Sequence, residues 1–190
     1  MPVRLTDVRT VYEGYMTLMT ATLAAEDGTA VSREIEHHGH AVAVLPYDAE
    51  RRTALLVSLP RAPVIWAGGP PALTEAIAGM IDGEDADACV RREAFEEAGV
   101  ELRELEPVGA AFASPGVSSE RLRLYLAPYR ARDRTGAGGG LAEEHEMITV
   151  HEVSLDALWA QVEAQQIEDM KTLALILALR VRRPDLFPAG

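Results

Sequence analysis

The stretch Gly79–Val100, GMIDGEDADACVRREAFEEAGV, decides how this chain of 190 residues is interpreted. It opens with a glycine-containing loop and predicts a helix over 85–98. Asp85 suits the N-cap, where unpaired backbone N–H groups need an acceptor, and Gly99 suits the position just after a helix. A stripe of apolar residues would pack this helix on a sheet: Val90, Ala94, Phe95 and Ala98.

Three carboxylates crowd one narrow face of this predicted helix. Glu93 and Glu97 lie one turn apart and Glu96 lies beside them. Like charges at this spacing repel by roughly 0.2–0.5 kcal/mol per pair. A solvated acidic surface is the simpler interpretation of such a face. A cation such as Mg²⁺ bound against it is the interpretation that explains why the charges gather, since Mg²⁺ prefers hard oxygen ligands.

Composition limits the possible partners. The net charge is −12, which argues against nucleic acid or an anionic membrane as a partner, because both are bound through basic surface. One cysteine, Cys89, rules out an intrachain disulfide and favours a reducing compartment. The polar N-terminus carries no secretory signal, and the apolar run Leu173–Leu179 is too short to span a bilayer. We therefore expect a cytoplasmic protein.

The chain divides into a strand-rich beginning and a mixed remainder. Residues 3–36 predict a small antiparallel sheet, with a turn at Glu26-Asp27-Gly28. Two apolar runs, 41–45 and 53–59, predict a buried hairpin. Prolines predict a loop over 60–72 that holds Arg61 and Trp66. The later elements are a short strand near 73–78, strands at 108–112, 122–129 and 147–153, an acidic glycine-hinged loop at 134–146, and helices at 154–165 and 169–182, the last buried nearly all round.

With these elements in place, the opening stretch resembles the Nudix box. The matching residues of its second half are Arg92, Glu93, Ala94, Glu96, Glu97, Gly99 and Val100. The first half departs from the pattern. Glu84 has the family spacing to Arg92 but is one residue too close to Gly79, and Asp85 stands where the spacing from Gly79 calls for Glu.

Further landmarks resemble the Nudix branch that acts on nucleotide sugars such as ADP-ribose and GDP-mannose. They are Tyr15–Leu18, Arg33-Glu34, Arg61, Ala78-Gly79, Ser114–Gly116 with Glu120, the glycines of 137–140, and Asp169 with Lys171-Thr172. The resemblance implies an α/β/α sandwich with a mixed sheet over 39–190. It also implies an N-terminal antiparallel β extension over 1–38, which serves as a dimerisation arm in this branch, so a homodimer is expected.

The resemblance also implies a metal site. The ligands would be the backbone carbonyl of Ala78 and the carboxylates of Glu93, Glu97 and Glu146, with Glu96 joining or supporting them. Mg²⁺ is the expected cofactor and Mn²⁺ a substitute. The general base would be Glu144, in the same loop as Glu146, with Glu143 and Glu120 as alternatives.

The remaining site candidates concern the substrate. Arg61 and Arg33 suit phosphate contact, because a guanidinium presents two donors to two oxygens. Lys171 would reach a phosphate or a sugar, and Tyr15 or Trp66 would stack on the base. The resemblance adds the backbone at Ala78 and the side chains of Glu34 and Glu120.

The expected function is Mg²⁺-dependent hydrolysis of the pyrophosphate of a nucleoside diphosphate sugar, GDP-mannose or ADP-ribose, to a nucleoside monophosphate and a sugar phosphate. The alternative is a catalytically weak Nudix domain that senses nucleotide. Such a sensor would be expected to lose one of the helix carboxylates, and all three are present. A cluster of histidines, His37, His38 and His40, lacks the spacing of a metal site and is interpreted as surface histidines.

Overall fold

The computed structural model describes residues 2–141 and 147–187. Its contacts divide the chain into two compact units, and each is described by itself. One unit consists of 1–40 together with 110–122, and the other of 41–109 together with 123–190. We call them the N-terminal unit and the sandwich unit.

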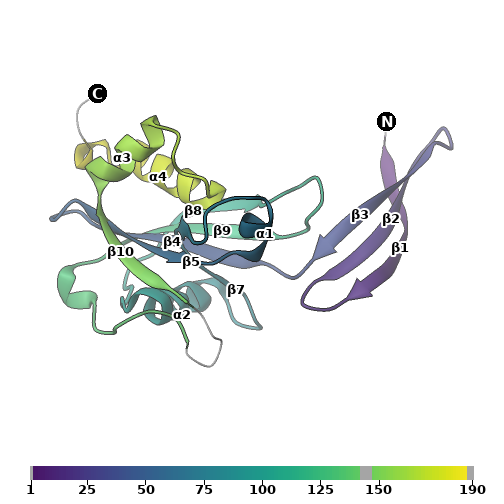
Figure 1. The fold of residues 1–190 in the computed structure, drawn as a ribbon. Coiled ribbons are helices and arrows are strands. Elements are labelled where there is room, and N and C mark those ends of the chain that lie inside the picture. The colour runs from purple at the N-terminus through teal and green to yellow at the C-terminus, as the bar shows by residue number, and fades with distance from the viewer. Residues whose placement is uncertain (1, 142–146, 188–190) are drawn as a thin grey trace. The chain divides into compact units, whose positions relative to one another are not determined.

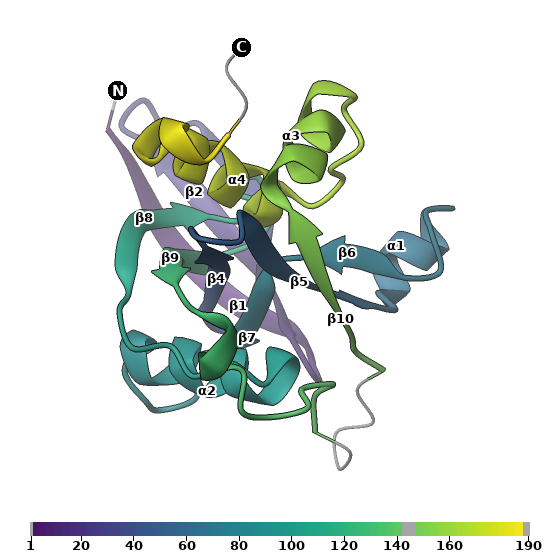
Figure 2. The same cartoon turned by 90° about the vertical axis from the view of Figure 1, so that its left-hand side faces the viewer.

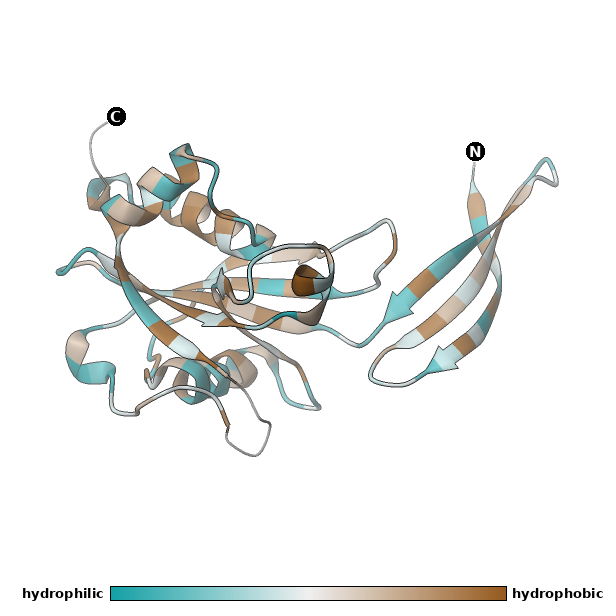
Figure 3. Ribbon diagram, viewed as in Figure 1, coloured by the Kyte–Doolittle hydropathy of each residue, from teal (hydrophilic) through white to brown (hydrophobic). Residues whose placement is uncertain are grey.

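The N-terminal unit is built on a three-stranded antiparallel sheet (Figure 1). Its strands are β1 Val3–Glu13, β2 Thr17–Ala25 and β3 Ala30–His37, with β2 in the centre. The β2–β3 turn is closed by Asp27, whose Oδ1 accepts the Thr29 N–H at 2.9 Å. Apolar and polar residues alternate along these strands (Figure 3). All eleven residues of β1 are exposed, so within the described part of this unit no element covers either face of the strand.

The sandwich unit contains a seven-stranded sheet. The strands are β4 Ala41–Asp48, β5 Thr53–Leu59, β6 Leu73–Glu75, β7 Ile77–Met80, β8 Glu106–Phe112, β9 Arg121–Pro128 and β10 Thr149–Ser154. Their order is β10-β5-β4-β9-β8, and β6 and β7 pair with β5 and β4. The last residues of β8 and the first residues of β9 lie within 110–122 and therefore belong to the N-terminal unit.

Helices cover both faces of this sheet (Figures 1 and 2). The helices are α1 Ala62–Trp66, α2 Ala86–Ala98, α3 Leu155–Glu163 and α4 Met170–Arg182, with short 3-10 turns at Ala131–Asp133 and Pro184–Leu186. α2 lies on one face, and α3 and α4 lie on the other. The predicted α/β sandwich with an antiparallel extension is therefore confirmed.

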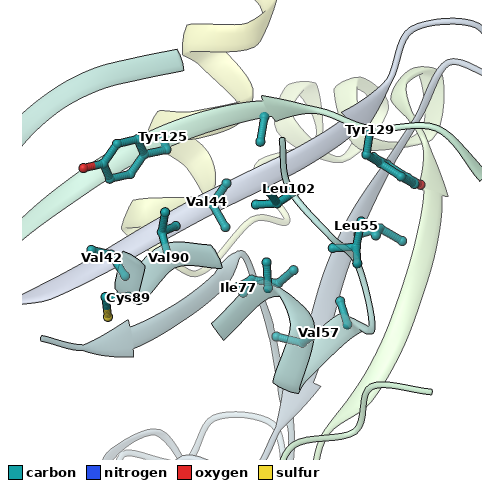
Figure 4. Packing of buried hydrophobic residues seen from close by; sticks show 14 of the residues in the cluster. Val42, Val44, Leu55, Val57, Ile77, Cys89, Val90, Leu102, Tyr125 and Tyr129 are labelled. Atoms are coloured by element: carbon teal, nitrogen blue, oxygen red, sulfur yellow. The ribbon is translucent and has the colours of Figure 1, made fainter. Parts of the chain in front are cut away.

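Strand alternation explains two separate cores. Successive side chains of a strand point to opposite faces, so a strand covered on both sides is apolar throughout. Val42 and Val44 of β4 belong to the core beneath α2 (Figure 4). Their neighbours Ala43 and Leu45 belong to the core beneath α3 and α4. Fully burying a Leu or Val side chain stabilises the fold by about 1.5–3 kcal/mol.

Three sequence expectations need correction. The predicted loop over 60–72 contains a helix, α1, because Pro63 in its first turn has the fixed φ that a helix start accepts. Phe95 is 46% exposed and does not join the buried stripe of α2. α4 is buried on one face only, since Val181 is 79% exposed. None of the helices within 2–141 and 147–187 is long and apolar enough to cross a bilayer.

Candidate active site

Helix α2 is fixed at both ends by the residues that predicted it. The side chain of Asp85 accepts the backbone N–H groups of Asp87 and Ala88 at 2.9 and 3.1 Å. Gly99 follows the helix in the left-handed region, with φ of +66°. A Cβ on Gly99 would lie 2.1 Å from the carbonyl oxygen of Gly136, so glycine is also needed for close approach of the next segment.

Strand β7 brings backbone against the acidic face of α2. β7 pairs antiparallel with β4, placing Gly79 opposite Val42. A Cβ on Gly79 would lie 1.9 Å from both Cδ and Oε1 of Glu93. Any side chain at this position would displace the Glu93 carboxylate. The glycine therefore makes room for a carboxylate directly on the strand.

Glu97 is the buried member of the acidic face. It is 4% exposed, and its Oε2 accepts the backbone N–H of Ala78 at 3.4 Å. Its burial contradicts the simpler interpretation of this face as a solvated acidic surface. β7 covers it, so Glu93 and Glu97 both lie against the Ala78–Gly79 backbone.

Arg92 holds the charges of the acidic region together. Its guanidinium contacts Glu84 at 2.7 Å, Glu93 at 2.9 Å and Glu96 at 2.8 Å. Hydrogen bonding to Glu84, together with the charges of Glu93 and Glu96, raises the pKa of Arg92 well above its ordinary value. The same contact lowers the pKa of Glu84.

The shortened loop before α2 therefore has two acidic residues with different tasks. Asp85 caps the helix, and Glu84 binds Arg92 through two hydrogen bonds, of 2.7 and 3.1 Å. Cys89 lies in the adjacent core, where burial raises the pKa of its thiol to about 12. It packs as a small apolar side chain and donates to the Met80 carbonyl at 3.3 Å.

A second charged cluster stands near the same strands. Glu75, at the end of β6, is 2% exposed, and both of its carboxylate oxygens accept hydrogen bonds from Arg61. Nε donates to Oε1 at 2.8 Å and Nη2 donates to Oε2 at 3.1 Å. Lys171 of α4 also donates to Glu75 Oε2, and to Asp169 at 3.0 Å. Burial raises the pKa of Glu75, but the bonds to Arg61 and the charge of Lys171 outweigh it and leave the pKa lowered.

Glu75 is a member of this charged cluster that the sequence interpretation missed. It links two predicted substrate residues, Arg61 and Lys171, which are 110 positions apart in the chain. The available signal was a charged residue inside an apolar segment, LTEAIAG, three positions before Ala78. A buried carboxylate in such a segment needs cationic partners.

The other predicted substrate residues belong to the N-terminal unit. Tyr15 is 88% exposed and stacks on His38, with ring centroids 6.3 Å apart. His38 contacts Glu36 through Nδ1 and lies 3.6 Å from Glu120 through Nε2. Arg33 and Glu34 lie on the exposed part of β3.

The remaining histidines of this cluster also have polar partners. His37 Nδ1 contacts the Ser119 hydroxyl at 2.7 Å, and His40 Nδ1 accepts the Arg121 N–H at 3.2 Å. Trp66, the other candidate for base stacking, lies at the end of α1 and is 90% exposed.

Three predicted acidic residues fall outside the described residues: Glu143, Glu144 and Glu146. Glu144 as base and Glu146 as metal ligand therefore stay predictions.

Comparison with known proteins agrees with this geometry. The family model described as NUDIX domain matches residues 37–173. This chain belongs to the NUDIX family. The GDP-mannose pyrophosphatase of Cronobacter sakazakii is 34% identical over 176 residues, covering 90% of this chain and 91% of that protein. The protein of the same description from Escherichia coli O157:H7 is 31% identical over 175 residues, covering 89% and 90%.

A solved structure has the same fold. A crystal structure described as an ADP compounds hydrolase matches with a TM-score of 0.77 at 17% identity, covering 97% of this chain and 96% of that one. The chain is thus a Nudix hydrolase, and such enzymes act on pyrophosphate bonds.

Nudix hydrolases use divalent cations, and the donors of α2 fit such an ion. Glu93 and Glu97 offer carboxylate oxygens beside the backbone of β7, where Gly79 leaves space for them. Within the described part of the chain, no three Asp, Glu, His or Cys side chains already stand together as a ligand set. Arg92 is bonded to Glu93 and Glu96 in this arrangement.

Proposed function

We propose that this Nudix hydrolase cleaves the pyrophosphate of a nucleoside diphosphate sugar, giving a nucleoside monophosphate and a sugar phosphate. GDP-mannose and ADP-ribose are the candidate substrates. The observation that carries the proposal is the pair of carboxylates, Glu93 and Glu97, held against the Ala78–Gly79 backbone. The GDP-mannose pyrophosphatases that align with nine-tenths of the chain support the sugar nucleotide as substrate class.

Mg²⁺ is the proposed cofactor, with Mn²⁺ as a substitute. Glu93, Glu97, Glu146 and the backbone carbonyl of Ala78 would hold it, and Glu96 would support them. Bound there, the cation supplies charge neutralisation at the phosphoryl oxygens and acidifies a bound water.

The chain's own residues have three further proposed tasks. Arg61 and Lys171 provide positive charge for the diphosphate, because both already stand as cations in one cluster. Glu144 removes the proton from the attacking water. Arg33 joins Arg61 in phosphate contact, Tyr15 stacks on the base, and Glu34 and Glu120 contact the substrate.

We further propose that 1–38 forms a dimerisation arm, that 39–190 forms the Nudix domain, and that the enzyme works as a cytoplasmic homodimer. The fully exposed strand β1, with Val3, Leu5 and Val8 on its surface, supports an arm that a second chain covers.

The test is a hydrolysis screen of GDP-mannose, ADP-ribose and other nucleotide sugars with Mg²⁺ or Mn²⁺, with product identification by mass spectrometry. Turnover of a nucleotide sugar to two monophosphates is the expected result. Binding without turnover across the panel would favour the nucleotide sensor instead.

The role of Glu144 has its own measurement. Glu144→Gln should lower kcat far more than it weakens metal affinity, since a base acts on the reacting water and not on the ion. A variant that loses metal binding in proportion to activity would place the base elsewhere.

A further inference from the structure

We propose that Glu75 is a positioning residue that fixes the guanidinium of Arg61 for diphosphate binding. This inference rests on the proposed function and extends it to a residue that contacts no substrate. The structural argument has three steps: the geometry of the Arg61–Glu75 pair, the difference in exposure between its members, and its attachment to α4.

The first step is the fork between the two side chains. Arg61 donates Nε and Nη2 to separate oxygens of Glu75, at 2.8 and 3.1 Å. A planar fork with two parallel bonds fixes both the position and the plane of a guanidinium. Nη1 lies outside this fork, and we assign it to an acceptor on the diphosphate.

The second step is burial. The side chain of Glu75 is 3% exposed, that of Lys171 12%, and that of Arg61 42%. Glu75 is therefore enclosed and cannot reach a substrate, whereas Arg61 can. A free arginine side chain loses rotamer entropy on binding, and a fixed one has lost much of it before the substrate arrives.

The third step is the attachment of Glu75 to α4. Lys171 bonds both Glu75 and Asp169, and Asp169 caps α4 by accepting the Thr172 N–H at 3.0 Å. The Thr172 hydroxyl in turn accepts the N–H of Ala76 at 2.6 Å, directly after Glu75. The end of β6 is thus held by a helix that begins 95 residues later, and Ala78 follows two residues after Ala76.

A purely structural ion pair is the competing explanation, and the chain offers a matched control for it. Asp48 is 3% exposed and binds Arg51 Nε at 2.7 Å, in the turn between β4 and β5. It also accepts the N–H groups of Glu50 and Arg51. Asp48→Asn removes a buried carboxylate from an arginine without touching Arg61.

The experiment is a double-mutant cycle on the full chain. Glu75→Gln keeps the size of the side chain but removes the charged fork, so kcat/KM should fall about 10–100-fold, mainly through KM. Asp48→Asn should stay within about twofold of wild type, since it lies outside the site. In an Arg61→Gln background, Glu75→Gln should cause a much smaller further loss, because the fork to Arg61 is already gone and only the contact with Lys171 remains to be lost.

A binding measurement separates this inference from the proposed function. Methylenediphosphonate is a diphosphate analogue that is not hydrolysed. Its calorimetric titration therefore reports on diphosphate binding by the Arg61 guanidinium without turnover. Glu75→Gln should weaken its affinity about tenfold and Asp48→Asn should not. If the wild type cleaves no nucleotide sugar, the proposed function fails, while this titration still decides the role of Glu75.

Two outcomes would overturn the proposal. One is additive loss from Glu75→Gln and Arg61→Gln. The other is a Glu75→Gln variant that matches Asp48→Asn in kcat/KM and in diphosphate affinity. If Glu75→Gln does not fold, as judged by its thermal unfolding, Glu75→Asp takes its place. That variant keeps the charge but is one methylene too short for the fork, and wild-type KM in it would also reject the proposal.

Discussion

Strands β1 and β4 contain similar apolar residues but differ completely in burial. All eight residues of β4 are buried, whereas all eleven of β1 are exposed. Both are rich in Val and Leu, but β4 is an apolar run and β1 alternates with Arg, Asp and Thr. Helices of the same unit cover both faces of β4, while no described element of the N-terminal unit covers the apolar side chains of β1. We therefore expect chemistry and stability to be concentrated in the sandwich unit.

The largest contrast should be in catalysis. Glu97→Gln in α2 should lower kcat by about 10²–10⁴-fold, because the amide cannot supply the charged oxygen that a metal-assisted reaction needs. The amide oxygen can still accept the Ala78 N–H, so the fold should persist. Steady-state kinetics with Mg²⁺ and a circular dichroism melt measure both effects. The comparison variant Glu34→Gln, on exposed β3, should change KM more than kcat. Near-wild-type turnover of Glu97→Gln would contradict the proposal that Glu97 is a metal ligand.

The next contrast concerns the cores. Leu56→Ala, at a position 1% exposed in β5, should cost about 2–5 kcal/mol of unfolding free energy through lost burial and the cavity left behind. Leu5→Ala, at a position 56% exposed in β1, should cost less than about 0.5 kcal/mol in dilute protein. Urea unfolding gives both values. A weaker dimer in Leu5→Ala, seen by sedimentation equilibrium, would support the arm, and an unchanged association would count against it.

A smaller contrast comes from two aspartates with the same local chemistry. Asp85 caps α2 and Asp27 closes the β2–β3 turn, and each accepts backbone N–H groups. Asp85→Ala should cost about 1 kcal/mol, since it leaves helix donors unpaired in the unit that folds around α2. Asp27→Ala should cost less, because the turn is open to water. Equal losses in chemical unfolding would show that the two units contribute alike to stability.

The smallest effect should be an opposite pH dependence of the folding stability contributed by His38 in the N-terminal unit and by Glu75 in the sandwich unit. Burial lowers the pKa of His38, but the hydrogen bond and charge of Glu36, with the charge of Glu120, outweigh it and raise the pKa above 6.5. The stability that His38 adds is present below pH 6.5 and is lost as pH rises through its raised pKa. Glu75 has a lowered pKa, so its contribution is present above pH 4.5 and is lost as pH falls through the lowered value.

Melting curves between pH 5 and 9 test the His38 contribution, with His38→Gln as the variant. The decline of Tm on the alkaline side of pH 6.5 should be shallower in His38→Gln than in wild type, because the variant has no proton to lose there. An identical slope in the two proteins would mean that the His38 contacts do not stabilise the folded chain.

Local features of the sandwich unit were predictable because the chain contains their causes in one short stretch. The ends of α2 follow from Asp85 and Gly99, and the face shared by Glu93 and Glu97 follows from helical spacing. The presence of α1 in a proline-rich segment was missed, because proline both ends helices and starts them. The exposure of Phe95 was missed because helical periodicity places this residue at the edge of the apolar stripe but does not show whether another element packs against that edge.

By itself, the sequence determined the acidic helix and its caps, since these depend on contacts within a few residues, and its resemblance to the Nudix family implied the α/β sandwich. Only the tertiary structure decided that Glu97 is buried under Ala78, 19 positions earlier, and that Glu75 joins Arg61 to Lys171. Such contacts depend on which strand lies beside which helix. The spacing of residues along the chain does not show which strand lies beside which helix. The burial of a carboxylate depends on the elements that pack over it.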